Sequence, residues 1–391
     1  MKKILGLLLA LCLIAGCTSA FAAGIPVEQV KIGYITIGDE NEGYSANHLN
    51  GLKEAQAALG ISDDQVLCKY NVPETEDAYE AAIDLAEQGC NIIFATSFGH
   101  ESYVFQAAAE YPNIQFCNAT GNSAMNSELT NVHNYFYAVY ESRYVSGVVA
   151  GMKLAQMIED GTITAENAKI GYVGAFPFAE VISGFTSFFL GARSQCPSVT
   201  MEVRYTNSWA DMALEKETAE ALIADGCVLI SQHADTTGAP SACEAAGVPC
   251  VGYNISMLPV APNTALTSAA GDWGAYVTYA VKCLIDGEEI ARDWCKGYAE
   301  GAVYTTELND SIVAPGTAEK VAELEAGFKA GTVKVFDTST FTVNGETLTS
   351  YTTAYGLDGI EMVSDGEFHE SAVRSAPYFD IIIDGITAVV E

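Results

Sequence analysis

The sequence predicts an α/β protein with two similar Rossmann-like lobes that face each other across a ligand cleft. The first observation is an internal repeat, because residues 31–35 (KIGYI) recur as residues 169–173 (KIGYV). The second is another matched pair at nearly the same spacing, 82–90 and 221–227, which each end in Gly-Cys before a short apolar run. The third is the alternation of such runs with helical stretches, which is typical of βαβ units and parallel sheets.

The elements of the two lobes follow in matching order. Each copy of the first motif predicts a strand, a glycine-bearing loop and a helix, over 48–59 in the first lobe and 180–193 in the second. The apolar runs 91–94 and 228–230 predict a further strand in each lobe. Ligands of parallel sheets bind beyond the carboxyl ends of the strands. We therefore expect the loops after equivalent strands to form the cleft walls.

Three later segments complete the predicted architecture. An amphipathic pattern predicts a helix over 272–285, and another helix is expected over 317–329. Residues 336–355 are rich in Thr, Val, Phe and Tyr, and Asn344-Gly345 between two apolar runs predicts a hairpin turn. The apolar tail 378–390 is expected to return to a lobe, so residues beyond 330 form a β-rich C-terminal extension.

This pattern divides the chain into three parts. Residues 1–16 are a signal peptide, and residues 28–137 with about 257–310 form lobe 1. Residues 138–256 with about 311–391, including the β-rich extension, form lobe 2. We see no low-complexity linker between the lobes, so short hinge segments are expected to join them.

The N-terminus predicts export and anchoring outside the cytoplasmic membrane. Two lysines precede an apolar run over 4–14, and Leu-Ile-Ala-Gly-Cys at 13–17 resembles a bacterial lipobox. Cleavage before Cys17 would leave that thiol to receive a lipid. The alternative is ordinary cleavage after Ala-Phe-Ala at 20–22. The apolar run is shorter than the roughly 20 residues of a membrane-spanning helix.

Composition narrows the classes of partner. The 391 residues carry a formal charge of −32, which argues against nucleic acid and anionic lipid surfaces as partners. Eleven cysteines are present, and nine remain once Cys12 and Cys17 are set aside. An odd number without CxxC spacing favours reduced, buried thiols, with a disulfide framework as the alternative.

No motif predicts catalysis, a metal or a cofactor. The chain has no GxSxG, HExxH or P-loop, so we expect a protein that is not an enzyme. Its histidines are scattered without metal-ligand spacing, and we interpret them as structural: His48, His100, His133, His233 and His369.

Several separated blocks resemble the basic membrane protein family of substrate-binding lipoproteins, also called PnrA-like. These blocks are 96–99, 116–121, 144–151 and 174–181. The segments 207–211 and 232–235 are similar to its adenine- and hypoxanthine-type branch. The resemblance covers roughly residues 28–310. It implies a periplasmic-binding-protein fold of type I with three hinge crossovers, a purine nucleobase or nucleoside as ligand, and an ABC importer with separate permease and ATPase subunits.

The chain departs from this family where members bind ribose. Residues 39–47 stand in place of the usual first-loop stretch, and Gly252-Tyr253-Asn254 lacks the usual aspartate. A lysine used near the last helix is replaced around Asp272-Trp273. These differences favour a free base, such as adenine or hypoxanthine, over a nucleoside.

A flat, polar, aromatic ligand needs rings to stack on and a few fixed donors and acceptors at its rim. The aromatic candidates lie at loop or helix-start positions near the predicted cleft, and core packing is the competing interpretation for each. They are Tyr44, Phe98, Phe176, Trp209 and Trp273.

The polar candidates lie in the same loops. Asp235 follows a predicted second-lobe strand, where its carboxylate could accept two N–H bonds or cap a helix. Gln232 and Asn254 each offer a donor and an acceptor. In the first lobe Ser45 and Ser97 are candidates that could instead cap helices, and Gly99 completes the set.

The sequence thus predicts a lipid-anchored receptor on the extracytoplasmic face of the cell membrane. It closes on a small purine ligand and delivers it to an ABC permease. Two other classes stay open: a surface sensor or adhesin without transport, and an extracellular nucleoside hydrolase.

Overall fold

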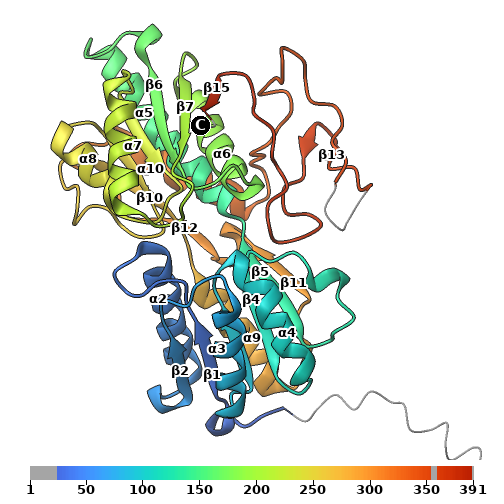
Figure 1. The fold of residues 1–391 in the computed structure, drawn as a ribbon. Coiled ribbons are helices and arrows are strands. Elements are labelled where there is room, and N and C mark those ends of the chain that lie inside the picture. The colour runs from blue at the N-terminus through green and yellow to red at the C-terminus, as the bar shows by residue number, and fades with distance from the viewer. Residues whose placement is uncertain (1–23, 354–358, 390–391) are drawn as a thin grey trace, which may run out of the picture.

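The computed structural model describes residues 24–353 and 359–389, which form two α/β lobes stacked one above the other (Figure 1). The predicted lipidation site, Cys17, and the signal segment 1–16 lie outside the described residues. The first lobe has a six-stranded parallel sheet. Its order is β11 (Asp293–Lys296), β5 (Val132–Tyr137), β4 (Gln115–Ala119), β3 (Ile92–Ala95), β1 (Ile32–Ile35) and β2 (Val66–Lys69).

Helices cover both faces of this sheet, as parallel strands require. Helices α2 (Gly43–Leu59) and α9 (Trp273–Asp286) pack on one face, and α3 (Glu76–Glu87) and α4 (Glu101–Glu110) on the other. The Asp272 carboxylate caps the start of α9, and Gly287, with a φ of 72°, ends it. The helix predicted over 272–285 is therefore confirmed.

The second lobe repeats this plan. Its seven-stranded sheet has the order β12 (Val303–Thr305), β10 (Ala265–Gly271), β9 (Cys250–Tyr253), β8 (Leu229–Gln232), β6 (Lys169–Gly174), β7 (Thr200–Tyr205) and β15 (Ile386–Val389). Only the β10–β12 pair is antiparallel among these strands. Five helices belong to this lobe: α5 (Val139–Glu159), α6 (Ala179–Gln195), α7 (Met212–Ala224), α8 (Gly238–Ala246) and α10 (Thr317–Lys329).

The structure confirms the repeat found in the sequence. Strand β1 lies between β2 and β3, and β6 lies between β7 and β8, each time in parallel register. The glycines in front of the second matched strands, Gly89 and Gly226, have the same φ of 87°. Such a left-handed conformation is readily adopted only by glycine, and both copies retain it.

The chain crosses between the lobes three times. The crossings join β5 to α5, β10 to α9, and β11 to β12. The structure places β10 and β12 in the second sheet, so only the part between them belongs with lobe 1. The sequence division assigned about 257–310 to lobe 1 because local composition does not show which sheet an apolar strand joins.

Residues 331–353 and 359–385 pack beside α6 (Figure 1) and contain fewer strands than predicted. Among its described residues, only β13 (Val363–Ser364) and β14 (Glu367–Phe368) form named strands. Asn344 and Gly345 make the predicted turn, with φ of 53° and 80°, but it closes on a single bridge. The aromatic residues pack on one another instead of forming a ladder, as in the Phe336–Phe379 stack with centroids 4.6 Å apart. The tail returns to a lobe, as predicted, where it forms β15 beside β7.

Polar contacts fix this segment to both lobes. The buried Glu370 carboxylate accepts hydrogen bonds from Ser183 Oγ of α6 (2.8 Å) and from the backbone N–H groups of Tyr378 (2.6 Å) and Phe379 (2.9 Å). Ser375 Oγ donates to Asp293 Oδ1 of β11 in the first lobe (2.7 Å). The segment therefore bridges the two lobes beside the chain crossings.

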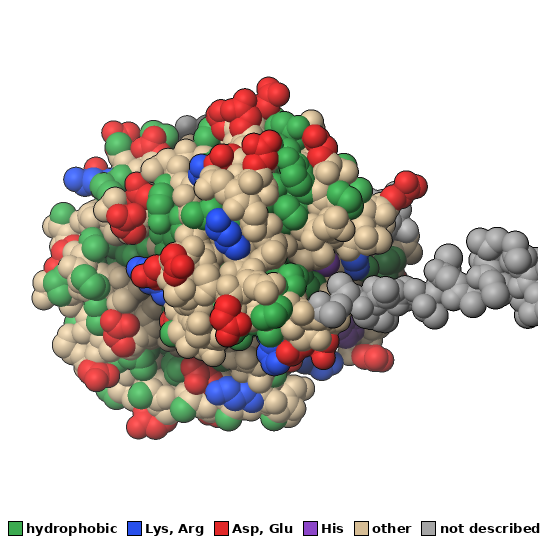
Figure 2. All heavy atoms as spheres, turned by 90° about the horizontal axis from the view of Figure 1, so that it is seen from below, with side chains coloured by type: hydrophobic (Ala, Val, Ile, Leu, Met, Phe, Trp, Pro, Cys, Tyr) green, Lys and Arg blue, Asp and Glu red, His purple; other side chains and the backbone are tan. Residues whose placement is uncertain are grey.

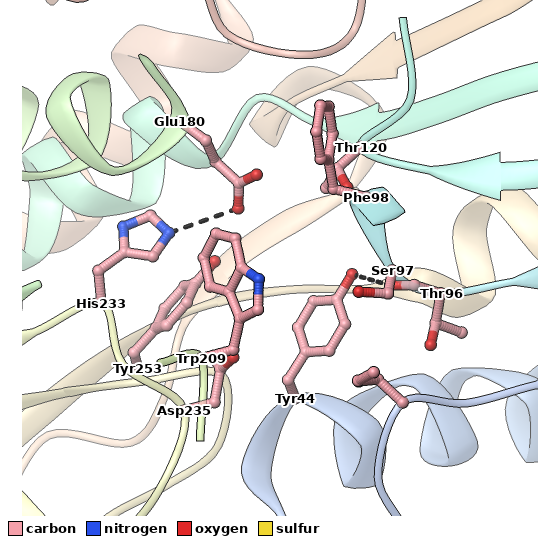
Figure 3. A pocket seen from close by; sticks show the side chains of 11 residues that line it. Tyr44, Thr96, Ser97, Phe98, Thr120, Glu180, Trp209, His233, Asp235 and Tyr253 are labelled. Atoms are coloured by element: carbon pink, nitrogen blue, oxygen red, sulfur yellow. Dashed lines mark hydrogen bonds and ion pairs between the residues drawn. The ribbon is translucent and has the colours of Figure 1, made fainter. Parts of the chain in front are cut away.

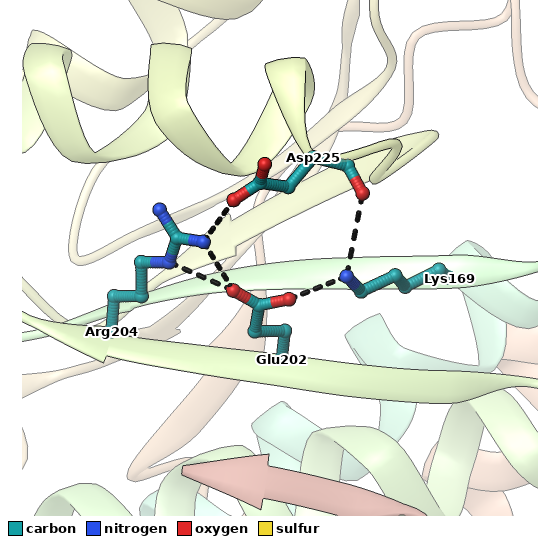
Figure 4. A network of polar contacts seen from close by, with 4 residues as sticks. All are labelled: Lys169, Glu202, Arg204 and Asp225. Carbon is teal, nitrogen blue, oxygen red and sulfur yellow. Dashed lines mark hydrogen bonds and ion pairs between the residues drawn. The ribbon is translucent and has the colours of Figure 1, made fainter. Parts of the chain in front are cut away.

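Surface charges follow the acidic composition. Figure 2 shows Asp and Glu side chains spread over one face, without a basic patch. A small network joins β6, β7 and the turn after α7, where Glu202 binds Lys169 and Arg204, and Arg204 binds Asp225 (Figure 4). Such surface pairs contribute about 0–1 kcal/mol each.

The described cysteines are all free thiols in the structure, and most are buried. Their burial agrees with the interpretation of most of them as core residues. Among the described residues, no helix combines the length and apolar character needed to cross a bilayer.

Replacing Glu370 with Ala is expected to loosen the segment 331–385. Four donors, Ser183 Oγ and the backbone N–H groups of Ser371, Tyr378 and Phe379, would lose their acceptor. The cost is about 1–3 kcal/mol for each group left buried and unsatisfied. We expect a lower melting temperature and faster limited proteolysis within this segment. Glu367→Ala, which removes a partly exposed ion pair with Lys334, is the control, and an equal effect of both variants would contradict the assigned role of Glu370.

A cavity between the two lobes

The cavity lies between the lobes and encloses about 360 Å³ of space between atoms, part of it open to solvent. Its walls come from strand ends, the loops after them and the first turns of helices in both lobes (Figure 3). The first lobe contributes Ile37, Tyr44, Thr96, Ser97, Phe98 and Thr120. The second contributes Glu180, Trp209, His233, Asp235 and Tyr253.

The lobes touch directly at one edge of the cavity. The backbone N–H of Gly43, at the start of α2, donates to the carbonyl of Asp235 after β8 (3.2 Å). A Cβ atom at position 43 would lie 2.8 Å from that oxygen. A glycine at this position therefore allows the two lobes to approach closely here.

Aromatic rings continue from one lobe to the other. Phe98 of the first lobe and Phe178 of the second have centroids 6.3 Å apart, and their side chains are 44% and 45% exposed. Phe178 stacks on Phe176 at 5.1 Å, and Phe176 meets Trp209 edge-on at 5.1 Å. Exposed aromatic rings gathered at one place mark a ligand or partner site.

Two tyrosines fix the inner walls. Tyr44 Oη donates to the carbonyl of Thr96 (2.6 Å), which ties α2 to the loop after β3. The Arg143 guanidinium lies 3.6 Å from the centre of the Tyr253 ring and donates to the carbonyl of Gln232 (2.6 Å). Arg143 is fully buried at the start of α5, behind the cavity wall.

Asp235 is the most buried carboxyl group that faces the cavity. Asn254 Nδ2 donates to its Oδ1 (2.7 Å), and Asn254 adopts a left-handed φ of 64°. Burial raises the pKa of Asp235 well above its usual value, and the nearby Glu42 and Glu215 carboxylates act in the same direction. A hydrogen-bond donor on a ligand would stabilise the charged form.

Glu180 and His233 form a second polar pair. His233 Nε2 lies 3.4 Å from Glu180 Oε1, but burial lowers the pKa of His233 well below its usual value. The contact is therefore one to a neutral imidazole. Burial also raises the pKa of Glu180 to about 7, against the opposing influence of Arg143. At neutral pH this carboxyl group can act as a donor or as an acceptor.

Five of the predicted site residues line the cavity, namely Tyr44, Ser97, Phe98, Trp209 and Asp235. Phe176 and Asn254 lie behind it and support Trp209 and Asp235.

The remaining four predicted residues hold loops or the core. Ser45 Oγ accepts from Gly38 N–H (3.0 Å), and Gly99 N–H donates to Glu74 Oε1 (2.8 Å). Gln232 Nε2 donates to two carbonyls of its own loop. Trp273 stacks on His48 at 3.8 Å between α2 and α9, because the apolar face of α9 turns toward the sheet.

Six lining residues were not predicted: Ile37, Thr96, Thr120, Glu180, His233 and Tyr253. Most directly follow or end strands, so a stricter use of the strand-end rule would have included them. Glu180 lies in the first turn of α6, where a carboxylate is usually interpreted as a favourable helix-start residue. No group of three or more metal-ligating side chains occurs in the part of the chain that the structure describes.

Comparison with known proteins decides the family. Residues 36–329 match the family described as ABC transporter substrate-binding protein PnrA-like. The chain belongs to this PnrA-like family. The family and fold are those of extracytoplasmic solute-binding proteins, and the resemblance seen in the sequence is confirmed.

Individual relatives agree with this assignment. A purine-binding protein of Brucella abortus is 33% identical over 79% of this chain and 83% of its own length. A putative ABC transporter glucose-binding protein of Haloferax volcanii is 30% identical over 73% of this chain and 68% of its own length. A solved ABC solute-binding protein from Aeropyrum pernix shares the fold, with a TM-score of 0.65 at 18% identity over 78% of this chain and 93% of that one.

Replacing Glu180 with Gln is expected to change how stability depends on pH. Between its usual pKa of 4.5 and about 7, the folded protein holds a proton that the unfolded chain releases. Glu180 therefore makes the folded state less stable as pH rises through this window, with no further change above it.

The melting temperature of Glu180→Gln minus that of the unmodified protein should therefore increase from pH 4.5 to 7 and then level off. Glu217→Gln, at an exposed position of α7, is the control. A difference that is constant over this range would contradict the environment described for Glu180.

Proposed function

We propose that this PnrA-like substrate-binding protein binds a purine, with the base in the cavity between the lobes. The observation that carries the proposal is the row of aromatic rings from both lobes beside the buried Asp235 carboxyl group. Offset stacking on such rings contributes about 0.5–1.5 kcal/mol beyond the buried area. A purine is flat and carries N–H donors and ring acceptors on its edge, so it matches both features.

The carboxyl groups can recognise the edge of the base. Asp235 can accept N–H bonds when ionised, and Glu180 can donate or accept according to its proton. Asn254 holds Asp235 in place through one oxygen. Each group would replace its lost hydration with contacts to the ligand, which is favourable only for a ligand with complementary donors and acceptors.

A ligand in the cavity would contact both lobes, and we expect it to favour their closure. Tyr44 and Phe98 belong to one lobe, and Trp209 and Asp235 belong to the other. A base held between them would stabilise the closed arrangement by its differential affinity for it. The three chain crossings are the hinge for this motion.

The relative named as a purine-binding protein supports a purine ligand. The relative named as a putative glucose-binding protein identifies sugar as the ligand to test against it. This chain lacks the groups with which other members of the family bind ribose. Their absence favours a free base over a nucleoside.

We further propose that Cys17 carries the lipid that anchors the receptor on the extracytoplasmic face of the cell membrane. The lipobox-like segment 13–17 supports this. An ABC permease and its ATPase subunit are the partners that this family implies.

Calorimetric titration of the purified protein tests the ligand class. Adenine, hypoxanthine, adenosine and inosine are titrated in turn, with glucose as the competing class. We expect binding of at least one purine and no binding of glucose. A folded protein that binds glucose, or that binds no purine, would refute the proposal.

Replacement of Asp235 by Ala and of Trp209 by Ala should each weaken purine binding about ten- to a hundred-fold. The first removes a charge-assisted hydrogen bond and the second a stacking face. Met212→Ala, an exposed residue close to Trp209 in the chain, is the control. If either variant melted at a much lower temperature but bound the purine normally when folded, the replaced residue would have a structural role and no role in binding.

Changing Cys17 to Ser should release the protein from the membrane fraction, because the lipid has no thiol to attach to. Cys12→Ser, within the apolar run of the signal segment, is the matched control and should stay membrane-bound. Retention of Cys17→Ser on the membrane would rule out anchoring through this residue.

A further inference from the structure

The C-terminal segment links the two lobes at one edge of the molecule. Residues 370–378, here called the strap, lie beyond residues 36–329, the part of the chain that matches the family. The Glu370 carboxylate accepts from Ser183 Oγ of α6 in the second lobe (2.8 Å), and Ser375 Oγ donates to Asp293 Oδ1 of β11 in the first lobe (2.7 Å). The strap therefore connects the lobes in addition to the three chain crossings.

The strap is held firmly on the second lobe. Strand β15, which ends the same segment, pairs in parallel with β7. Arg193 of α6 donates to the carbonyls of Thr340 (2.6 Å) and Asp384 (3.1 Å), which lie before and after the strap in the chain. A movement of the first lobe relative to the second is therefore taken up at the bond between Ser375 and Asp293.

The position of Asp293 makes this bond sensitive to lobe opening. Asp293 begins β11, the edge strand of the first sheet, and the chain crosses to the second lobe after this strand ends at Lys296. Three steps of extended strand separate the two points, which is about 10 Å. A rotation of the lobes about the crossing therefore displaces Asp293 from the strap and stretches its bond to Ser375.

The Asp293 carboxyl group also makes the bond a strong one at neutral pH. Burial raises its pKa to about 6, against the opposing positive charge of Arg374. The group is therefore ionised at pH 7, and a hydrogen bond to a charged acceptor is stronger than one between neutral groups.

A second contact between the lobes, far from the strap, reports whether they are closed. Gly43 N–H donates to the carbonyl of Asp235 (3.2 Å), and β1, the strand before Gly43, is separated from β11 by three strands. Gly43 is the first residue of α2, where an N–H group has no acceptor within the helix. Separation of the lobes therefore exposes this amide to solvent.

We propose that the strap restrains opening of the lobes, and that the bond between Ser375 and Asp293 favours the closed arrangement when no ligand is bound. Loss of this bond would let the lobes separate where Gly43 meets Asp235. The inference concerns the protein without ligand, so it does not depend on which molecule the cavity binds. A receptor restrained in this way presents both cavity walls together before its ligand arrives.

Hydrogen–deuterium exchange of the purified protein without ligand tests the proposal. In Ser375→Ala and in Asp293→Ala, the Gly43 amide should exchange about tenfold faster, because each variant removes one partner of a hydrogen bond to a charged group. The variant with both changes should exchange no faster than either single variant, since both changes act on one bond. Small-angle X-ray scattering should show a larger radius of gyration for all three variants.

Two comparisons separate lobe opening from general loosening. The amides of Tyr44 and Ser45 are bound within the first lobe by the Glu42 carboxylate (2.5 and 2.8 Å), so their exchange should not change. Ser350→Ala is the matched control, because the Ser350 hydroxyl donates to the Glu361 carboxylate within the C-terminal segment (2.5 Å). This variant should leave the exchange of every amide at the start of α2 unchanged.

Three results would overturn the inference. The first is an unchanged Gly43 amide in both Ser375→Ala and Asp293→Ala, and the second is an equal acceleration in Ser350→Ala. The third is an acceleration that the Tyr44 amide shares, because the start of α2 would then have loosened without lobe opening. The melting temperature checks that each variant is folded, and Ser375→Ala, which removes one hydroxyl group, decides the matter if Asp293→Ala does not fold.

Discussion

The carboxyl ends of the strands in both parallel sheets face the same gap, and the site depends on this alignment. Each sheet places short loops there, so that residues distant in sequence, such as Thr96 and Asp235, line one cavity. The three crossings keep the two sheet edges opposed. The contact between Gly43 and the carbonyl of Asp235 shows how closely they can approach. Without that alignment, the rings and carboxyl groups would be separate surface features.

Much of the fold could be predicted because short sequence patterns indicate its strands, helices and turns. The two matched motifs, with Gly89 and Gly226 in the same conformation, identified the repeat and its strands. The sequence could not predict which sheet contains β10, because the composition of an apolar strand does not show which strand it pairs with. The segment beyond residue 330 has strand-like composition, but its aromatic residues pack as separate anchors.

The site was predictable where loop position alone decides it, and less so where packing decides it. Trp209 and Asp235 follow strands and line the cavity. Trp273 also follows a strand, at the start of α9. However, it lies on the apolar face of that helix and stacks on His48 in the core. The place of Glu180 in the cavity wall depends on contacts between distant segments, which no local sequence pattern predicts.

The repeat has a consequence for the orientation of a bound molecule. The two lobes share the same arrangement of strands and helices, but the loops that line the cavity differ between them. The loop after β3 presents hydroxyl groups and Phe98, whereas the loop after β8 presents His233 and Asp235. A molecule with two unlike edges would therefore meet different groups in each of its two orientations. Duplication thus gives the two lobes the same architecture, and differences in a few loop residues make the two walls of the cavity chemically different.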